Sequence, residues 1–303
     1  MTRAAGTGLV LAAGGMLALG RSILGADEAW FLQVVHRVTS GEVLYRDVFL
    51  GVTPLSVYLL APLAWVWRSE VWLVRAALVA CVAASALLCS VIARRLGSDR
   101  EFSPLLGAAL LLLAFPVPVA PYSPLATFFL LAALAAVLRW DENRDENPAR
   151  SWQALVLAGV ACGMGFASKQ NIGLYAFGAA LLIVLSSRMR PGEGARRAQL
   201  ALVSTSFLLS AAVPLVPVWW SGALPEFLDY GFLNKGTYLR RAGVSYFEGL
   251  RSLAALLRSD PLSSALVGNA AYLIPPLAWA GLAWSWWRSS GPSRRRAEIV
   301  AAF

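Results

Sequence analysis

Two adjacent carboxylates, Asp27 and Glu28, are the residues of this chain best placed for chemistry. They come directly after a long apolar stretch and are followed at once by the aromatic residues Trp30 and Phe31. Ionisable side chains at the edge of a membrane span are costly and are usually retained there for a function. Such a pair can present an acid or a base to a substrate at the membrane surface. The alternative is structural, with Asp27 capping an interfacial helix through its free backbone N–H groups.

A second pair, Arg46 and Asp47, lies in the same polar segment, between a turn at Gly41 and the sequence Thr53–Leu55. The proline at position 54 predicts that a new helix begins there. Arg46 could bind a phosphate while Asp47 aligns an acceptor hydroxyl. The two side chains could equally form a surface ion pair that fixes the loop. The single histidine, His36, is interpreted as an interfacial residue rather than a base.

Lys169 is a third candidate, because it interrupts the apolar run of residues 152–187. A compact ammonium group can stabilise the negative charge on a leaving phosphate, and Gln170 and Asn171 add hydrogen-bond donors beside it. A lysine at such a break can also extend to the lipid headgroups and do nothing more. The same predicted face carries an alternative set of basic residues: Lys235, Arg240 and Arg241.

The composition defines the class of protein. Hydrophobic residues make up 58% of the chain, charged residues 14%, and the mean hydropathy is +0.62, whereas a soluble domain is about half apolar and about a quarter charged. The net charge of +9 comes mainly from arginines scattered over many loops, which disfavours nucleic-acid binding. The cysteines (Cys81, Cys89 and Cys162) lie in apolar stretches, without the spacing of a metal site or a disulfide framework. We therefore predict an all-α polytopic membrane protein.

Crossing the ~30 Å hydrocarbon core of a bilayer takes about 20 helical residues. By that measure the single domain, residues 1–303, holds about eight membrane spans: 4–24, 71–93, 104–120, 124–139, 152–168, 171–187, 199–219 and 263–287. Two apolar runs are too long for one crossing and are predicted to fold back, one at the prolines of 116–124 and one at Lys169. The apolar segment Pro54–Trp67 is too short and is predicted to lie in the interface. Residues 297–303 read as the start of another apolar segment, so a chain truncated at its C-terminus is an open interpretation.

The arginines indicate the orientation of the spans. They are concentrated in the connections around 94–100, 139–150, 188–197 and 288–296. Because cytoplasmic loops carry the excess of basic residues, both termini are predicted to be cytoplasmic. The first external loop (residues 25–70) and the second external loop (residues 220–262) then face outward, together with Lys169. The N-terminus also fits a cleaved signal peptide loosely, although its apolar stretch is longer than such peptides usually have.

Taken in order along residues 20–190, these features resemble the GT-C glycosyltransferases, membrane enzymes that transfer sugar from polyprenyl-phosphate carriers. The motifs that carry the resemblance are Asp27-Glu28, the Gly-x-x-x-Tyr-Arg-Asp run from Gly41, the Pro54-Leu55 helix start, Arg75 and Arg94–Gly97 in the following span, and Lys169-Gln170. The acidic pair is similar to that of the protein O-mannosyltransferases. The overall layout resembles that of the aminoarabinose-transferase-like enzymes.

The predicted external hairpin at residues 121–124 departs from the family pattern. Several members carry a second acid between the third and fourth spans, where it can help to hold a divalent metal. The corresponding tip here is Pro-Tyr-Ser-Pro and has no carboxylate. This departure argues against a metal site built from two separated acids. We therefore expect no cofactor, and a divalent metal stays an open alternative.

The resemblance implies a hexosyl- or pentosyltransferase at the outer face of the cytoplasmic (inner) membrane. Asp27 or Glu28 would take the proton of an acceptor hydroxyl, on a glycan, lipid or protein, while the donor phosphate lies near Lys169. Direct displacement would invert the anomeric configuration. Two other interpretations remain open: a transporter or flippase of a lipid-linked substrate, and a GT-C-like protein that has lost its activity.

Overall fold

The computed structural model of the protein describes residues 26–67, 71–96, 120–144, 147–187, 193–234, 274–288 and 290–303, with single positions between 248 and 258. The predicted span 4–24, and the span 104–120 apart from its last residue, lie outside the described residues. So does the alternative set of basic residues in the second external loop, Lys235, Arg240 and Arg241.

The described part of the chain is built from helices, and a longer loop, residues 40–54, joins α2 to α3. In chain order they are α2 (Ala26–Thr39), α3 (Leu55–Trp67), α4 (Val71–Arg95), α6 (Tyr122–Asn143), α7 (Pro148–Ser168), α8 (Gln170–Leu185), α9 (Glu193–Ala212), η1 (Val213–Leu215), α10 (Val216–Trp220), α11 (Leu224–Leu228), η2 (Asp229–Leu233), α15 (Ile274–Arg288) and α16 (Gly291–Ala302). The predicted class, an all-α polytopic membrane protein, is confirmed.

Among the described helices, four are long and apolar enough to cross a membrane: Val71–Arg95, Tyr122–Asn143, Ala149–Ser168 and the continuous run Gly194–Trp220. Their 20 to 27 residues extend about 30–40 Å at 1.5 Å per residue, which suits a hydrocarbon core of ~30 Å. The last run joins α9 to α10 through the 3-10 turn η1, where Pro214 and Pro217 each lack the backbone donor that a regular helix requires.

The predicted ranges 71–93, 124–139, 152–168, 171–187 and 199–219 fall on α4, α6, α7, α8 and α9–α10, with ends that differ by a few residues. The predicted range 263–287 is described only from Ile274, as α15. The total of eight crossings stays a prediction, because not all of the chain is described.

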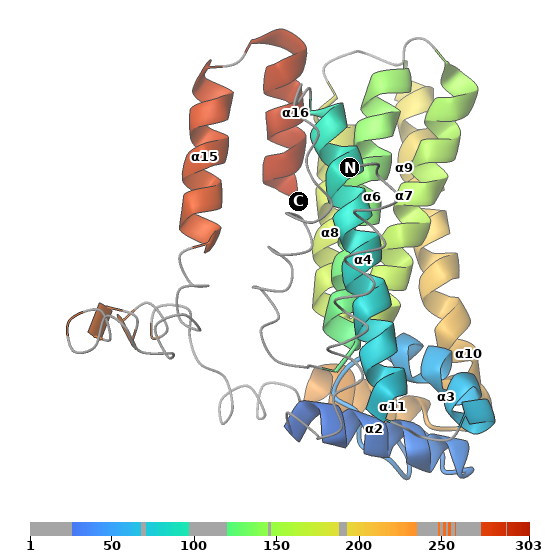
Figure 1. Ribbon diagram of the computed structural model, residues 1–303. Helices are drawn as coiled ribbons and strands as arrows, with labels where there is room; N and C mark the ends of the chain where they lie inside the picture. Colours follow the sequence, from blue (N-terminus) through green and yellow to red (C-terminus); the bar gives the residue numbers. More distant parts are fainter. Residues whose placement is uncertain are drawn as a thin grey trace.

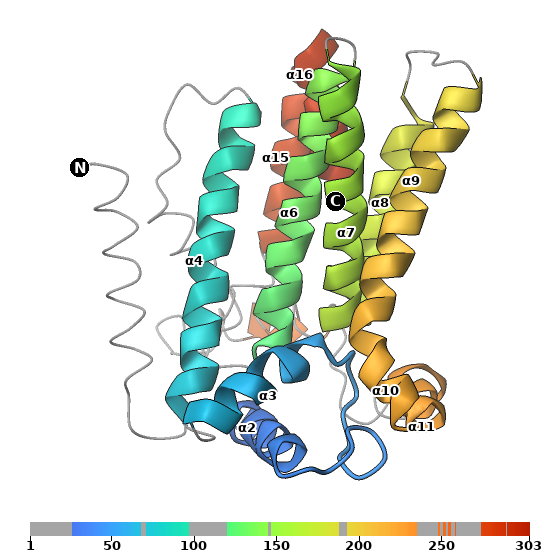
Figure 2. The same ribbon diagram turned by 90° about the vertical axis from the view of Figure 1, so that its right-hand side faces the viewer.

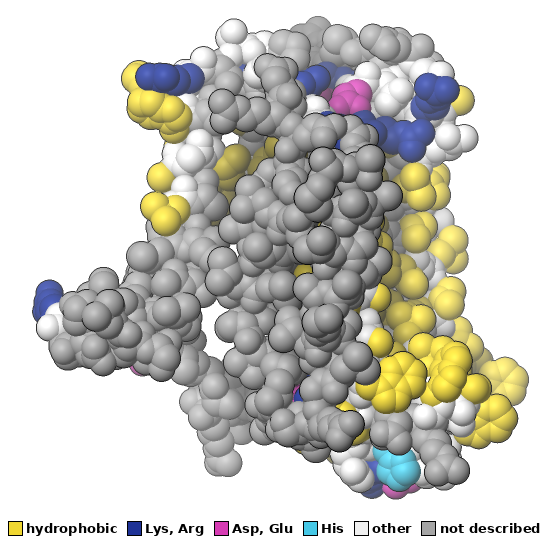
Figure 3. Space-filling model, in the orientation of Figure 1, with side chains coloured by type: hydrophobic (Ala, Val, Ile, Leu, Met, Phe, Trp, Pro, Cys, Tyr) yellow, Lys and Arg dark blue, Asp and Glu magenta, His cyan; other side chains and the backbone are white. Residues whose placement is uncertain are grey.

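The long helices α4, α6, α7, α8 and α9 stand side by side, and the short helices α2, α3, α10 and α11 gather at one end of this bundle (Figures 1 and 2). Helices α2 and α3 lie across the bundle end (Figure 2), and their position at a membrane interface stays a prediction. The opposite end carries the turn between α15 and α16 and a concentration of arginine side chains (Figure 3). We call these the loop end and the arginine-rich end.

Helix α7 lies at the centre of the bundle, packed against α6, α8 and α9. Its neighbours approach closely because glycine stands at the points of contact. A methyl group at Gly159 would lie 2.5 Å from the Val203 carbonyl oxygen of α9, and one at Gly163 would overlap the Ser210 hydroxyl. Two glycines four positions apart are a common means of close helix contact in membranes, where packing rather than the hydrophobic effect holds helices together.

The second predicted fold-back is a single extended residue, Lys169 (φ −154°, ψ 106°), between α7 and α8. The chain reverses there because Gly173, in the first turn of α8, lies directly against the backbone of Phe166. A Cβ atom at Gly173 would overlap the Phe166 backbone nitrogen and Cα. The tight hairpin therefore depends on the absence of a side chain at this position.

Substituting Gly173 is expected to destabilise the protein, whereas the same change further along α8 is not. Gly173→Ala forces two backbones apart, and overpacking of this kind typically costs 1–3 kcal/mol or more. Gly178→Ala is the matched control, because a methyl group there meets nothing within 4 Å. Thermal unfolding of both purified variants in the same detergent measures the difference in stability. Equal unfolding midpoints would contradict the prediction that the close contact of Gly173 stabilises the hairpin.

Candidate functional site at the loop end

The two predicted catalytic acids point in different directions. Asp27 is exposed, whereas Glu28 is 0% exposed and forms a two-pronged ion pair with Arg75 of α4. Arg75 donates from Nε to Oε1 at 2.6 Å and from Nη2 to Oε2 at 3.0 Å. Successive residues of a helix are rotated by about 100°, so α2 can direct one carboxylate outward and its neighbour inward.

The burial of Glu28 argues against one of the two acids predicted as the general base. Both of its carboxylate oxygens accept hydrogen bonds from a guanidinium, so this carboxylate is not placed to take a proton from a substrate. Its role is to fix the start of α2 against the start of α4. A charge buried in this way is tolerated only while its partner is present. Of the two acids, Asp27 alone keeps a carboxylate that is open to solvent.

The ammonium of Lys169 is held by the first turn of α6. Its Nζ donates to the Ser123 hydroxyl at 3.0 Å and lies 5.6 Å from the centre of the Tyr122 ring. The structure thus brings the predicted hairpin tip, residues 121–124, to the break between α7 and α8. A lysine held by a hydroxyl and by an aromatic face is positioned, not simply extended into the headgroups.

Tyr122 connects this lysine to the helix that bears the acids. Its ring also lies 6.1 Å from that of Phe31, which is fully buried in α2. Phe31 follows Asp27 by four residues, or about one helical turn. Asp27 and Lys169 therefore belong to elements that pack on the same aromatic side chain, although 142 positions separate them in the sequence.

Gln170 is buried and links the start of α8 to the π-helical turn η2. Its Nε2 donates to the Gly231 carbonyl at 2.9 Å, and its Oε1 has no hydrogen-bond partner among the described residues. Gln170 was predicted to contribute to substrate binding by adding hydrogen-bond donors beside Lys169. Its amide nitrogen is engaged within the protein, which leaves only the carbonyl oxygen able to accept from another group.

Arg46 and Asp47 adopt the loop-fixing arrangement that the sequence left open as an alternative. The two exposed side chains pair with each other at 3.2 Å, and Asp47 Oδ2 accepts from the Val43 N–H at 2.8 Å. The Arg46 guanidinium, followed by the Val43 N–H, holds the pKa of Asp47 below its usual range. A lowered carboxyl pKa stabilises the folded loop above the ordinary pKa, and this contribution is lost as the pH falls through the lowered value.

Tyr45 explains why this loop turns outward. Its φ of 72° is unusual for a residue with a side chain, and its ring is buried against Phe227 at 5.0 Å. Its hydroxyl donates to the Val52 carbonyl at 2.7 Å. A strained conformation of this kind persists only when the surrounding contacts enforce it. Burial of Tyr45 therefore anchors the loop, while its neighbours Arg46 and Asp47 remain at the surface.

Three contributors to the site were not identified as such from the sequence: Ser123, which binds Lys169; Thr53, whose hydroxyl donates to the Phe166 carbonyl of α7; and Arg75 as the partner of Glu28. A signal for Arg75 was present, because an arginine inside an apolar span usually requires an acid. His36 is exposed near the end of α2. Within the described residues, no group of three or more His, Cys, Asp or Glu side chains could hold a metal ion.

The fold and the helices at the loop end define an all-α multi-pass membrane protein. The family model of the dolichyl-phosphate-mannose-protein mannosyltransferases matches residues 49–224, and the chain belongs to this family. The comparison with curated proteins gave no match to the chain.

Two solved structures have a similar fold: ArnT from Cupriavidus metallidurans bound to undecaprenyl phosphate (TM-score 0.57, 17% identity) and the same protein in the apo state (TM-score 0.51, 18% identity). The alignments cover 98% and 99% of this chain but only 57% and 58% of the ArnT chains. The chain thus spans a little more than half the length of these structures.

The contrast between the two adjacent acids gives a stability prediction. Removing one partner of a buried ion pair typically costs 3–5 kcal/mol, so Glu28→Gln and Arg75→Met are expected to lower the unfolding midpoint markedly. Asp27→Asn, at the exposed neighbouring position, is expected to change it little. Replacing both partners of the pair by leucine should recover much of the loss, because no unpaired charge remains. If Glu28→Gln proved as stable as Asp27→Asn, the pair would not have the structural role assigned to it.

Proposed function

We propose that the protein is a membrane glycosyltransferase that moves a sugar from a polyprenyl-phosphate donor to a hydroxyl acceptor. The observation that carries this proposal is the position of Lys169, held beside Ser123 and Tyr122 at the end of the bundle that also bears Asp27. Membership of the mannosyltransferase family supports sugar transfer. Likeness to the fold of a protein bound to undecaprenyl phosphate supports a donor of that chemical class.

Lys169 is suited to the phosphate of the donor. An ammonium group has three hydrogen-bond donors, and one of them is used by Ser123. The remaining donors can contact a phosphate whose polyprenyl tail lies among the apolar helices. As the bond between the anomeric carbon and the phosphate oxygen breaks, negative charge gathers on that oxygen, and a positioned ammonium stabilises the charge most at that moment.

Asp27 is suited to the acceptor. Its exposed carboxylate takes the proton of the hydroxyl while the hydroxyl oxygen bonds to the anomeric carbon. The phosphate leaves with the bonding electron pair from the opposite side of the sugar, so the configuration inverts. Glu28 does not take part and holds α2 in place through Arg75.

The orientation proposed for this chemistry places the loop end outside the cytoplasmic membrane. The concentration of arginines at the opposite end (Figure 3) supports this arrangement, because basic residues remain on the cytoplasmic side. The loop end, with Asp27 and Lys169, then faces outward, and the arginine-rich end faces the cytoplasm.

Site-directed variants test the two roles separately. Asp27→Asn is expected to abolish glycan transfer in a complemented deletion strain, because loss of a general base typically costs on the order of 10²–10⁴ in rate. It should leave binding of undecaprenyl phosphate by the purified protein unchanged. Lys169→Ala should weaken that binding and the transfer together, and Lys169→Arg should retain part of both, because the charge is kept. Envelope-glycan profiling and native mass spectrometry provide the two readouts.

His36→Gln serves as the control for the activity assay, because it changes an exposed polar residue of the same helix α2. Full complementation by the Asp27→Asn variant would exclude Asp27 as the general base. The purified protein could bind undecaprenyl phosphate while deletion of its gene leaves the envelope glycans unchanged. That pair of results would favour transport or lost activity over sugar transfer.

Cysteine labelling tests the orientation. Ser40→Cys lies in an exposed turn after α2 and should react with a membrane-impermeant maleimide in intact cells. Gly194→Cys lies at the start of α9, where an added Cβ meets no atom within 4 Å, and should react only after lysis. The reverse pattern would invert the orientation and remove the proposed outer-face site.

A further inference from the structure

The hydroxyl of Ser123 has a proton that its contact with Lys169 does not use. The Ser123 Oγ atom lies 3.0 Å from the Nζ atom of Lys169. An ammonium group carries donors only, whereas a hydroxyl both donates and accepts, so Ser123 is the acceptor in this hydrogen bond. Among the residues that the structure describes, no other group forms a hydrogen bond with this hydroxyl. Its proton is therefore available to an acceptor from outside that part of the chain.

The ammonium beside this hydroxyl has no counter-charge within the described residues. Lys169 contacts the Ser123 hydroxyl and the Tyr122 ring, and it forms no ion pair with a described carboxylate. Burial lowers the pKa of Lys169 from its usual value, because a partly dehydrated charge is less stable than one in water. A bound anion would restore the stability of the charged form.

The start of α6 adds to the positive potential around Lys169. Ser123 is the second residue of this helix, and no side chain caps the helix at Pro121. The first backbone N–H groups of a helix lack partners within the helix and give that end a partial positive charge. Ser123 and Lys169 are both half-buried, so each remains partly open to a ligand.

The donors at this point suit a phosphate that has lost its sugar. The ammonium has three donors and spends one on Ser123, so two remain, and the serine proton supplies a third. A phosphate monoester offers three terminal oxygens, whereas a phosphate that still carries a sugar offers fewer. A set of three donors therefore holds the departing phosphate more strongly than the intact donor, which is the difference that favours a reaction.

We propose that Ser123 is a second phosphate-binding residue of the donor site. Its Oγ atom accepts from the Lys169 ammonium and donates its own proton in a hydrogen bond to an oxygen of the same phosphate. The hydroxyl keeps this proton throughout, and no covalent bond to serine forms. The inference rests on the function proposed above and deepens it, because it assigns the phosphate to a pair of residues from two helices rather than to the lysine alone.

Native mass spectrometry of the purified full chain, titrated with undecaprenyl phosphate, tests this assignment. Ser123→Ala is expected to weaken binding on the order of ten-fold, because it removes a hydrogen bond to a charged group. Ser123→Thr keeps the hydroxyl and should retain most of the affinity. Ser123→Ala should also weaken the residual binding of Lys169→Ala several-fold, since the serine contacts the phosphate directly. Undecaprenol, which has no phosphate, should bind equally to all of these variants.

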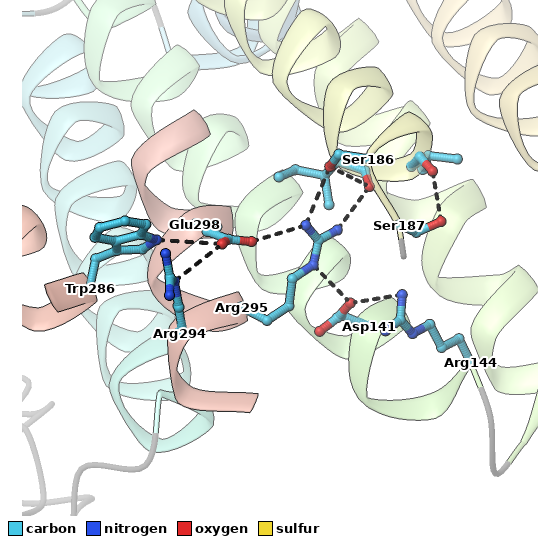
Figure 4. Close-up of polar contacts among 10 residues, drawn as sticks. Asp141, Arg144, Ser186, Ser187, Trp286, Arg294, Arg295 and Glu298 are labelled. Carbon is cyan, nitrogen blue, oxygen red and sulfur yellow. Dashed lines mark hydrogen bonds and ion pairs between the residues drawn. The ribbon is translucent and has the colours of Figure 1, made fainter. Parts of the chain in front are cut away.

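Ser186→Ala is the matched control. At the arginine-rich end of the bundle the Ser186 hydroxyl accepts from the Arg295 guanidinium at 3.3 Å (Figure 4). The variant thus removes a contact of the same kind, between a serine and a cation, from the end opposite Lys169. It should leave the titration with undecaprenyl phosphate unchanged.

The outcomes separate this inference from the function on which it rests. Normal binding by Ser123→Ala together with weak binding by Lys169→Ala would refute the inference alone, whereas normal binding by both would refute the proposed donor site. An effect of Ser123→Ala that disappears in the Lys169→Ala background would mean that the serine only orients the lysine, contrary to the proposal. If Ser123→Ala does not fold, Ser123→Cys decides, because a thiol has similar size but is a weak donor. Unchanged binding by the cysteine variant would contradict the direct contact.

Discussion

The close packing of helix α7 is the constraint on which the other helices depend. In a bilayer, helices gain little by hiding apolar side chains from one another, because lipid is equally apolar, so contact has to come from fit. Glycines let α9 approach α7 at Gly159 and Gly163, and let α8 fold back against Phe166 at Gly173. The last turn of α7 is thereby held in place. The Thr53 hydroxyl of the loop between α2 and α3 donates a hydrogen bond to its Phe166 carbonyl.

The loop end is assembled on the last turn of α7 by a few polar contacts in an otherwise apolar setting. Arg75 and Glu28 join α2 to α4, Gln170 joins α8 to η2, and Tyr45 closes the first loop against Phe227. Each contact links segments far apart in the chain. In surroundings of low polarity an unmatched hydrogen-bonding group is expensive, so the partners specify one arrangement of the loops. The exposed carboxylate of Asp27 gains a defined position because its neighbour is immobilised.

Much of the fold could be predicted from the sequence because apolar length and proline position are local properties. The reversal at Lys169 followed from a run too long for one crossing, and the prediction that Pro54–Trp67 forms a short separate helix followed from a run too short to span. The division of roles between Asp27 and Glu28 was not predicted, because it depends on which face of α2 meets Arg75. The same holds for Lys169, whose partner Ser123 lies 46 residues away and is brought near only by the packing of α6 on α7.

The pairing of Arg46 with Asp47 illustrates a second limit of sequence reasoning. Adjacent opposite charges are compatible with substrate binding and with loop closure alike, and the residue that decides between them is Tyr45, whose backbone conformation no pattern of neighbouring residues indicated. Its buried ring fixes the direction of the turn. Local strain of this kind is set by tertiary contacts, which lie beyond the reach of periodicity and composition.

The one-residue break between α7 and α8 has a mechanical consequence. Two rigid rods that meet at a single residue can change their mutual angle only about that residue, and points near the vertex then move far less than points near the free ends. Lys169 lies at the vertex of the two helices, and Gly173, one turn beyond it, allows them to pack closely together. Any splaying of the hairpin about this residue would displace the arginine-rich end much more than the ammonium. A charge that stays in place while the rest of the protein fluctuates does not have to move when an opposite charge develops beside it.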